Sequence, residues 1–322
     1  MKYLPFDIKD ISNYRAELMG WSILWIMMLH FTFTQIKPMG FIAQYGYAGV
    51  DIFILVSGLG LFFSLEKSDN ILHFYKKRLL RIFPTYYLIG FFKNLLLDHR
   101  SYTEYIYQYT TLGYWTGGDY NDWYIPALIM LYLISPVIKI LLDKHFYFIL
   151  CGIVMCSFFT AYYFIDKEEL LDRSHFFLIY RIPDFIFGMI CAYWIKQSIP
   201  TTYYYIILIA GFPLFAILYP SHHLVYNYKY FSLVFLLPFF IFIFIQLSKY
   251  IKFINPILAI IGKASFEIYL IQGIFFSAIL KELLPIIPLW HDVITIILVI
   301  GSSLLGILTH WLIGKIGFLR LS

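Results

Sequence analysis

The chain has 322 residues, of which 61% are hydrophobic and only 13% are charged. A soluble domain usually has about 45–50% apolar and about 25% charged residues, so this composition excludes an ordinary soluble protein and indicates a membrane protein. The net charge of +5 is small and scattered along the chain, which argues against a nucleic-acid-binding protein.

A single domain, residues 1–322, is expected to form an all-α, polytopic transmembrane bundle of about ten spans. About 20 helical residues cross the hydrocarbon core of a membrane, and strands would need alternating polarity and a closed barrel. In chain order, the apolar runs of this length are residues 18–36, 46–65, 80–97, 123–142, 146–165, 176–195, 202–219, 230–248, 257–280 and 292–314.

The distribution of Lys and Arg predicts that both termini lie in the cytoplasm, because short cytoplasmic connections are rich in these residues. The connections expected on the opposite side carry acids instead, among them Asp98 and Glu104. The basic residues expected on the cytoplasmic side are Lys2, Lys9, Arg15, Lys67, Lys76, Lys77, Arg78, Arg81, Lys139, Lys144, Lys196, Lys249, Lys252, Lys263, Lys315 and Arg320.

Two ionisable residues, His30 and Asp51, stand inside the first two apolar runs. The turn between these runs centres near Phe41, which predicts that both residues lie at about the same depth on antiparallel helices. A carboxylate beside an imidazole fixes its tautomer and raises its basicity, so the pair is a candidate for general-base catalysis. The same pair could also be a structural contact between helices, or a proton relay in a transporter. Ser57, nearly two turns deeper than Asp51, is expected where small residues let the helices approach closely.

Basic residues at the start of the third run form a candidate binding patch for a phosphorylated ligand. Arg78 and Arg81 are three residues apart and share a helix face, and Lys77 is next to them. Guanidinium groups suit phosphate, although juxtamembrane basic residues also serve as lipid anchors. Arg181, early in the sixth run, could form a local ion pair with Asp184.

The connection at residues 99–122 and the start of the fourth run are rich in aromatic residues, including Trp123 and Tyr124. Flat aromatic faces suit stacking against sugar rings, but Tyr and Trp are also common at membrane interfaces. The three cysteines, Cys151, Cys156 and Cys191, lie in apolar runs without a C-x-x-C spacing, so neither a metal site nor a disulfide is predicted.

Six segments form an ordered set of motifs across about 260 residues. They are RAELMGWSILWIMMLH, GVDIFILVSGLGL, FYKKRLLRIFPTYYL, DWYIPALIMLYLISPVI, YRIPDFIFGMICA and ASFEIYLIQG. In this order they resemble the acyltransferase-3 superfamily of bacterial membrane acyltransferases. The resemblance implies that His30, at the end of the first segment, is essential, and it places Arg181, Tyr269 and Gln272 in matched segments.

The chain departs from the family pattern at two positions. Met19 stands where the family often has an arginine, and Arg15, one helical turn earlier, is the residue that could take its place as a donor-binding residue. Gln272 stands where the family has a late histidine, so this position keeps hydrogen bonding but loses a titrating group.

The resemblance implies a membrane O-acyltransferase of the bacterial cytoplasmic membrane that needs no bound cofactor. Acetyl-coenzyme A, or another acyl-coenzyme A, is the expected donor from the cytoplasm, and a carbohydrate hydroxyl of a surface polysaccharide or its lipid-linked precursor is the expected acceptor. The alternative is a proton-coupled transporter or flippase of a glycan-linked lipid, although no internal repeat typical of such transporters is visible in the sequence.

Overall fold

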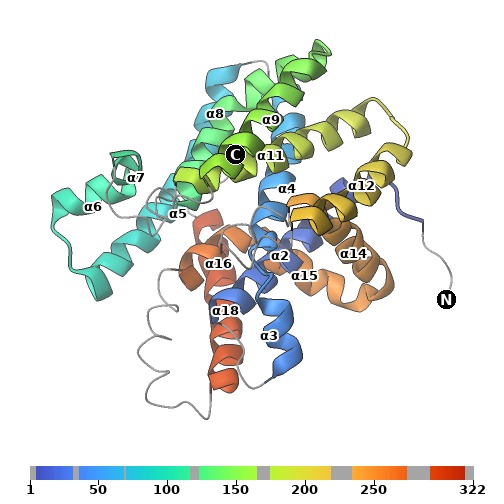
Figure 1. Cartoon of the computed structure of the whole chain (residues 1–322). Helices are drawn as coiled ribbons and strands as arrows, with labels where there is room; N and C mark the ends of the chain where they lie inside the picture. The colour runs from blue at the N-terminus through green and yellow to red at the C-terminus, as the bar shows by residue number, and fades with distance from the viewer. Residues whose placement is uncertain are drawn as a thin grey trace. The chain divides into compact units, whose positions relative to one another are not determined.

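The computed structural model describes residues 5–31, 36–68, 70–116, 123–164, 175–218, 234–273 and 291–315, and within these ranges every regular element is a helix (Figure 1). This confirms the all-α prediction for that part of the chain. Three of the described helices are long and apolar enough to cross a membrane, or four if the bent pair Leu237–Tyr250 and Lys252–Lys263 counts as one span. Each of the ten apolar runs contains helix, whereas the count of ten spans stays a prediction.

The helices follow the apolar runs closely at most of their boundaries. They are α1 (Asp10–Asn13), α2 (Arg15–Phe31), α3 (Lys37–Ala43), α4 (Ala48–Glu66), α5 (Ile71–Lys93), the π-helix η1 (Asn94–Asp98), α6 (Tyr102–Tyr109), α7 (Leu112–Thr116), α8 (Tyr124–Asp143), α9 (Tyr147–Phe164), α11 (His175–Lys196), α12 (Thr202–Leu218), the 3-10 turn η3 (Val234–Leu236), α14 (Leu237–Tyr250), the 3-10 turn η4 (Lys252–Ile254), α15 (Asn255–Lys263), α16 (Ser265–Ile271) and α18 (His291–Lys315).

The chain divides into two compact units, each assembled from distant stretches of sequence. Unit 1 contains residues 1–13, 51–76 and 102–246, and unit 2 contains residues 14–50, 77–101 and 247–322. Neither unit is a continuous segment, because the chain passes from one to the other several times.

Unit 1 is built around three helices that run in the same direction, α4, α8 and α11. The backbone of α11 at Phe185 lies against Gly58 of α4, and the backbone of α4 at Leu55 lies against Gly188 of α11. A side chain larger than hydrogen at either glycine would collide with these backbone atoms, so the two glycines permit the close approach.

An ion-pair network holds together the C-terminal ends of these three helices. Glu66 of α4 lies 2.6 Å from Lys139 of α8 and 2.5 Å from Lys196 of α11. Both ammonium groups also lie over the ring of Phe62, at 5.7 and 5.9 Å from its centroid. Asp143 pairs with Lys139 one turn further along α8, at 2.5 Å. The network fixes the relative register of the three helices.

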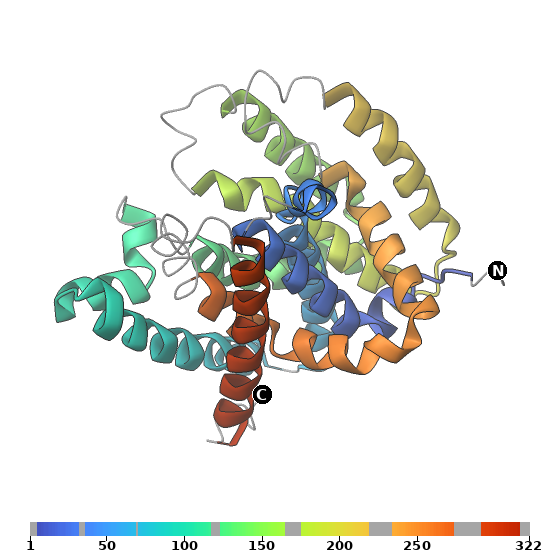
Figure 2. The same ribbon diagram turned by 90° about the horizontal axis from the view of Figure 1, so that it is seen from below.

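Unit 2 is organised by α2, which packs against α15 in the antiparallel sense. Gly20 of α2 lies against the backbone of Leu258, and Gly262 of α15 lies against the backbone of Ala16. The following helix, α16, lies alongside α18, where Gly306 contacts Ile268 (Figure 2).

Two expectations about these helices are wrong. The run 257–280 does not begin as one helix: α15 ends before Ala264 and α16 begins at Ser265, and α15 packs mainly on α2 whereas α16 packs mainly on α18. Its residues 274–280 lie outside the described part of the chain.

The second correction concerns the hairpin of the first two runs. The connection between α2 and α4 centres near Phe41 as expected, but its residues 37–43 form the helix α3. The helices are antiparallel as expected, but Gly46 lies against Trp25 and Gly49 against Ser22. Ser22 is eight residues, or about 12 Å, before His30 along α2. The start of α4 therefore packs well below His30, and a hairpin symmetric about Phe41 is not formed.

Candidate active site

His30 lies in the last turn of α2 and is exposed, whereas residues 16–29 of the same helix are buried or half-buried. Its Nδ1 atom lies 2.8 Å from Oε1 of Gln272, a fully buried side chain in unit 2 at the end of α16. A carbonyl oxygen can only accept, so Nδ1–H is the donor. This tautomer leaves the lone pair of Nε2 on the other side of the ring, ready to accept a proton.

Phe31 and Ile36, which follow His30 in the chain, are hydrogen-bonded to residues at the start of α18. The hydroxyl of Thr295 donates to the backbone oxygen of Phe31 at 3.1 Å, and the backbone N–H of Ile36 donates to Asp292 at 2.8 Å. The other carboxylate oxygen of Asp292 lies 3.1 Å from Nδ1 of His291, and both side chains are buried. These contacts fix the end of α2, and with it the position of His30.

Sequence reasoning missed His291, Asp292 and Thr295. A signal was present, because an adjacent His–Asp pair at the start of an apolar run is costly in a membrane unless it has partners. A second missed pair lies between α16 and α18, where Glu267, a buried residue, is 3.1 Å from His310. Tyr269 precedes Gln272 by three residues and therefore shares its helix face.

Asp51 forms an ion pair within unit 1. Its Oδ1 atom lies 3.2 Å from Nε of Arg181, and the guanidinium lies over the ring of Trp123, 4.6 Å from the centroid. Asp184, one turn after Arg181, is close enough to interact electrostatically with both Asp51 and Arg181. Asp51, Arg181 and Asp184 are all almost fully buried.

The sequence-predicted residues thus join in two sets. His30 joins Gln272, and Asp51 joins Arg181 and Trp123. His30 belongs to unit 2 and Asp51 to unit 1, so their expected pairing stays a prediction, and within unit 2 the amide of Gln272 contacts the imidazole. The ion pair of Arg181 is with Asp51, and Asp184 interacts with both electrostatically, so the expected local Arg181–Asp184 ion pair stays a prediction.

The remaining predicted residues lie as follows. Lys77, Arg78 and Arg81 are half-buried on α5, with Arg78 and Arg81 on one face, and Arg15 is exposed at the start of α2. Ser57 is half-buried beside Gly58. Tyr124 is buried, with 6% of its side chain exposed, so it belongs to the interior of unit 1. Residues 117–122 of the aromatic-rich connection lie outside the described residues.

Comparisons with known proteins agree with the motifs. A protein of Acidianus two-tailed virus named "Putative acetyltransferase ORF330" is 25% identical over 179 residues, which cover 53% of this chain and 52% of that protein. The chain thus matches about half the length of this relative. No solved structure matches significantly. The profile of the family described as "Acyltransferase domain" matches residues 18–312, a range that includes every predicted site residue except Arg15. The resemblance to the acyltransferase-3 superfamily is therefore confirmed, and the chain belongs to this family of acyl-transferring enzymes.

Proposed function

We propose that the protein is a membrane O-acyltransferase that moves an acyl group, with acetyl as the expected one, from cytoplasmic acyl-coenzyme A to a carbohydrate hydroxyl. The acceptor would be a cell-surface polysaccharide or its lipid-linked precursor, at a bacterial cytoplasmic membrane. The observation that carries the proposal is the geometry of His30: an exposed imidazole whose Nδ1–H is held by buried Gln272. Family membership supports acyl transfer as the reaction.

In direct transfer, Nε2 of His30 removes the proton of the acceptor hydroxyl as the oxygen attacks the thioester carbonyl. The new C–O ester bond forms, the C–S bond breaks, and the coenzyme A thiolate leaves and takes up the proton from the imidazolium. In the alternative, His30 itself carries the acyl group between the two substrates. Both routes need the same tautomer, with an unprotonated Nε2.

The proposal includes ten spans with both termini in the cytoplasm. In an up-and-down chain of ten spans, the second, fourth and sixth spans run in the same direction. The helices α4, α8 and α11 occupy those places and are parallel, and their shared end carries Lys139 and Lys196. The positive-inside rule puts that end in the cytoplasm.

Transfer of label from radioactive acetyl-coenzyme A tests the function. Membranes that contain the protein, supplied with tritiated acetyl-coenzyme A, are expected to incorporate label into polysaccharide or glycolipid, and mild alkali is expected to release it as acetate. Incorporation no higher than in membranes that lack the protein contradicts the proposal.

The donor site is tested at the two arginines of α5. The double variant Arg78→Ala, Arg81→Ala is expected to raise KM for acetyl-coenzyme A about tenfold or more, because hydrogen bonds to charged groups contribute about 1.5–3 kcal/mol each. Steady-state kinetics at varied donor concentration measure the effect, and Lys76→Ala, an exposed residue of the same helix, is the control. An unchanged KM in the double variant means that the arginines are membrane anchors only.

A further inference from the structure

A second imidazole with a fixed tautomer lies in unit 2, at the start of α18. Nδ1 of His291 is 3.1 Å from Oδ1 of Asp292, and because an ionised carboxylate can only accept, Nδ1–H is the donor. The lone pair of the ring is therefore on Nε2, and no hydrogen-bond partner of Nε2 is found in the part of the chain that the structure describes. Neither of the acyl-transfer routes that use His30 gives this His–Asp pair a role.

The pair lies beside the end of α2 that carries His30. His291 and Thr295 are four residues apart on α18 and share a helix face. The hydroxyl of Thr295 donates to the backbone oxygen of Phe31, the residue that follows His30, at 3.1 Å. The face of α18 that carries His291 therefore contacts the end of α2, and both imidazoles belong to unit 2.

The partners of the two imidazoles differ in charge. Gln272 gives His30 a neutral acceptor, which orients the ring but does not offset the charge of an imidazolium. Asp292 gives His291 a carboxylate, which orients the ring and also stabilises the imidazolium that a base becomes when it takes up a proton. His30 is therefore suited to act as a neutral nucleophile, and His291 is suited to act as a base.

The His–Asp pair is held rigidly. The other carboxylate oxygen of Asp292 accepts the backbone N–H of Ile36 at 2.8 Å. His291 and Asp292 expose only 7% and 5% of their side chains, so little water screens the carboxylate from the imidazole. The exposed remainder of the ring is the part that a substrate hydroxyl can reach.

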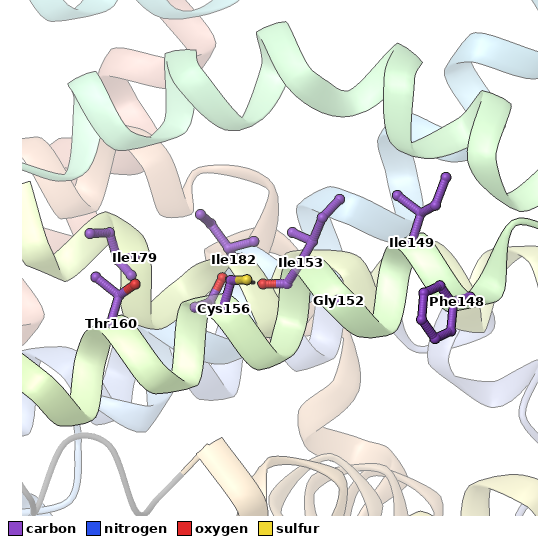
Figure 3. A pocket seen from close by; sticks show the side chains of 9 residues that line it. Phe148, Ile149, Gly152, Ile153, Cys156, Thr160, Ile179 and Ile182 are labelled. Carbon is purple, nitrogen blue, oxygen red and sulfur yellow. Dashed lines mark hydrogen bonds between the residues drawn. The ribbon is translucent and has the colours of Figure 1, made fainter.

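The groove between α9 and α11 in unit 1 offers no comparable group (Figure 3). Its lining includes Ile153, Cys156, Thr160 and Ile182, and none of the described lining residues carries an imidazole, a carboxylate or an amine. That groove therefore supplies no base for an acceptor hydroxyl, whereas the start of α18 does.

We propose that His291 is the general base that activates the acceptor hydroxyl, in the route in which His30 carries the acyl group. The inference rests on the proposed function and makes it more specific. A two-step transfer needs a nucleophile and a separate base, because Nε2 of acyl-His30 is bonded to the acyl group and cannot accept a proton.

In the first step, Nε2 of His30 attacks the thioester carbonyl. A C–N bond forms, the C–S bond breaks, and the coenzyme A thiolate leaves and takes a proton from water. In the second step, Nε2 of His291 removes the proton of the acceptor hydroxyl as its oxygen attacks the acyl carbonyl. The C–O ester bond forms, the C–N bond breaks and His30 returns to its neutral form. The imidazolium of His291 then gives its proton to the hydroxide left by the first step.

The experiment follows tritiated acetyl groups in membranes that contain the full chain and their own acceptor. The reaction is stopped at successive times, and label is measured separately on the isolated protein and on glycolipid and polysaccharide. Label is expected on the wild-type protein before it reaches the acceptor. In His291→Asn, whose amide can still donate to Asp292, the protein is expected to take up label at the wild-type rate. Label is expected to leave it about 10²-fold or more slowly, which is the usual contribution of a general base.

Two further variants and one reagent separate loss of the base from loss of structure. Asp292→Asn can still accept from Ile36, but its amide N–H faces Nδ1 of His291 and favours the other tautomer, so the second step is expected to slow to a similar extent. His73→Asn removes an exposed imidazole of α5 and is expected to behave as the wild type. Hydroxylamine attacks an acyl group without a base, so it is expected to release label from the wild type and from His291→Asn equally fast.

Three outcomes would overturn the inference. Label that leaves His291→Asn at the wild-type rate would mean that another group is the base. A labelled acceptor without label on the wild-type protein at any time would mean a one-step transfer. Uptake of label by His291→Asn that is slowed as much as its departure would mean that the pair only anchors the end of α2. If the wild type labels neither itself nor the acceptor, the proposed function fails and the inference fails with it, so the two failures are distinguishable.

Discussion

Replacement of His30 by alanine is expected to lower kcat for acyl transfer by a factor of about 10²–10⁴, the usual contribution of a positioned general base. The imidazole is the exposed group whose tautomer the structure fixes, and alanine supplies no proton acceptor in its place. Tritiated acetyl transfer in membranes measures the rate, with the amount of folded protein determined by fluorescence-detected size-exclusion chromatography. Transfer at the wild-type rate in His30→Ala would falsify the catalytic assignment.

Gln272 is expected to position the imidazole of His30, and replacing Gln272 tests this role. Gln272→Met keeps a side chain of similar length but cannot accept the Nδ1–H bond, so the preferred tautomer of His30 is lost. We expect kcat to fall by about tenfold, consistent with one hydrogen bond of about 1–1.5 kcal/mol, while KM for acetyl-coenzyme A stays unchanged. Gln272→Glu, which can still accept from Nδ1–H, is expected to keep more activity than Gln272→Met. If both variants lose activity only in proportion to folded protein, Gln272 is structural.

Arg181→Met is expected to destabilise the protein by about 3–5 kcal/mol, because it leaves Asp51 buried without its counter-charge. Thermal unfolding of the purified protein in detergent measures the change. The double variant Asp51→Leu, Arg181→Met is expected to recover part of the loss, because it removes one of the two buried carboxylates near Arg181 and leaves Asp184. A loss in Arg181→Met that the double variant does not reduce would mean that the contact of Arg181 with Trp123, not the ion pair, is the stabilising feature.

The sequence identified single residues of the candidate site better than it identified their partners. His30 and Asp51 stand out because an ionisable residue inside an apolar run is costly. Their observed partners are far along the chain: Gln272 is 242 residues from His30, and Arg181 belongs to the sixth run. Such pairings depend on how the helices pack, which composition and spacing do not determine.

The wrong predictions about the fold also concern features that depend on how the helices pack. The symmetric hairpin at Phe41 assumed that a connection between spans is a turn, but residues 37–43 form α3, with Pro38 in its first turn. Hydropathy also treated residues 257–280 as one run, because the apolar residues on both sides outweigh Lys263, Ser265 and Glu267 at the break. The helical class itself followed from composition and was confirmed for the described residues.

The contacts at the end of α2 could not be predicted from the sequence, because the residues that make them lie at a span boundary. His291 and Asp292 begin the last apolar run, where polar residues are common in any membrane protein. The contacts of Asp292 with Ile36 and of Thr295 with Phe31 distinguish them from ordinary boundary residues.

The pairing of Asp51 with Arg181 also sets an order of events during biosynthesis. Arg181 is made 130 residues after Asp51, which at about 5–20 residues per second is a delay of roughly ten seconds. During that interval α4 has left the ribosome, but the carboxylate of Asp51 does not yet have Arg181 as its partner. An unpaired carboxylate is unfavourable among lipid tails. In the proposed membrane topology, α4 is therefore expected to stay beside the insertion machinery until α11 is made. A chain truncated before α11 would present an unpaired acid in the bilayer, a mark by which membrane proteases could distinguish incomplete copies from finished ones.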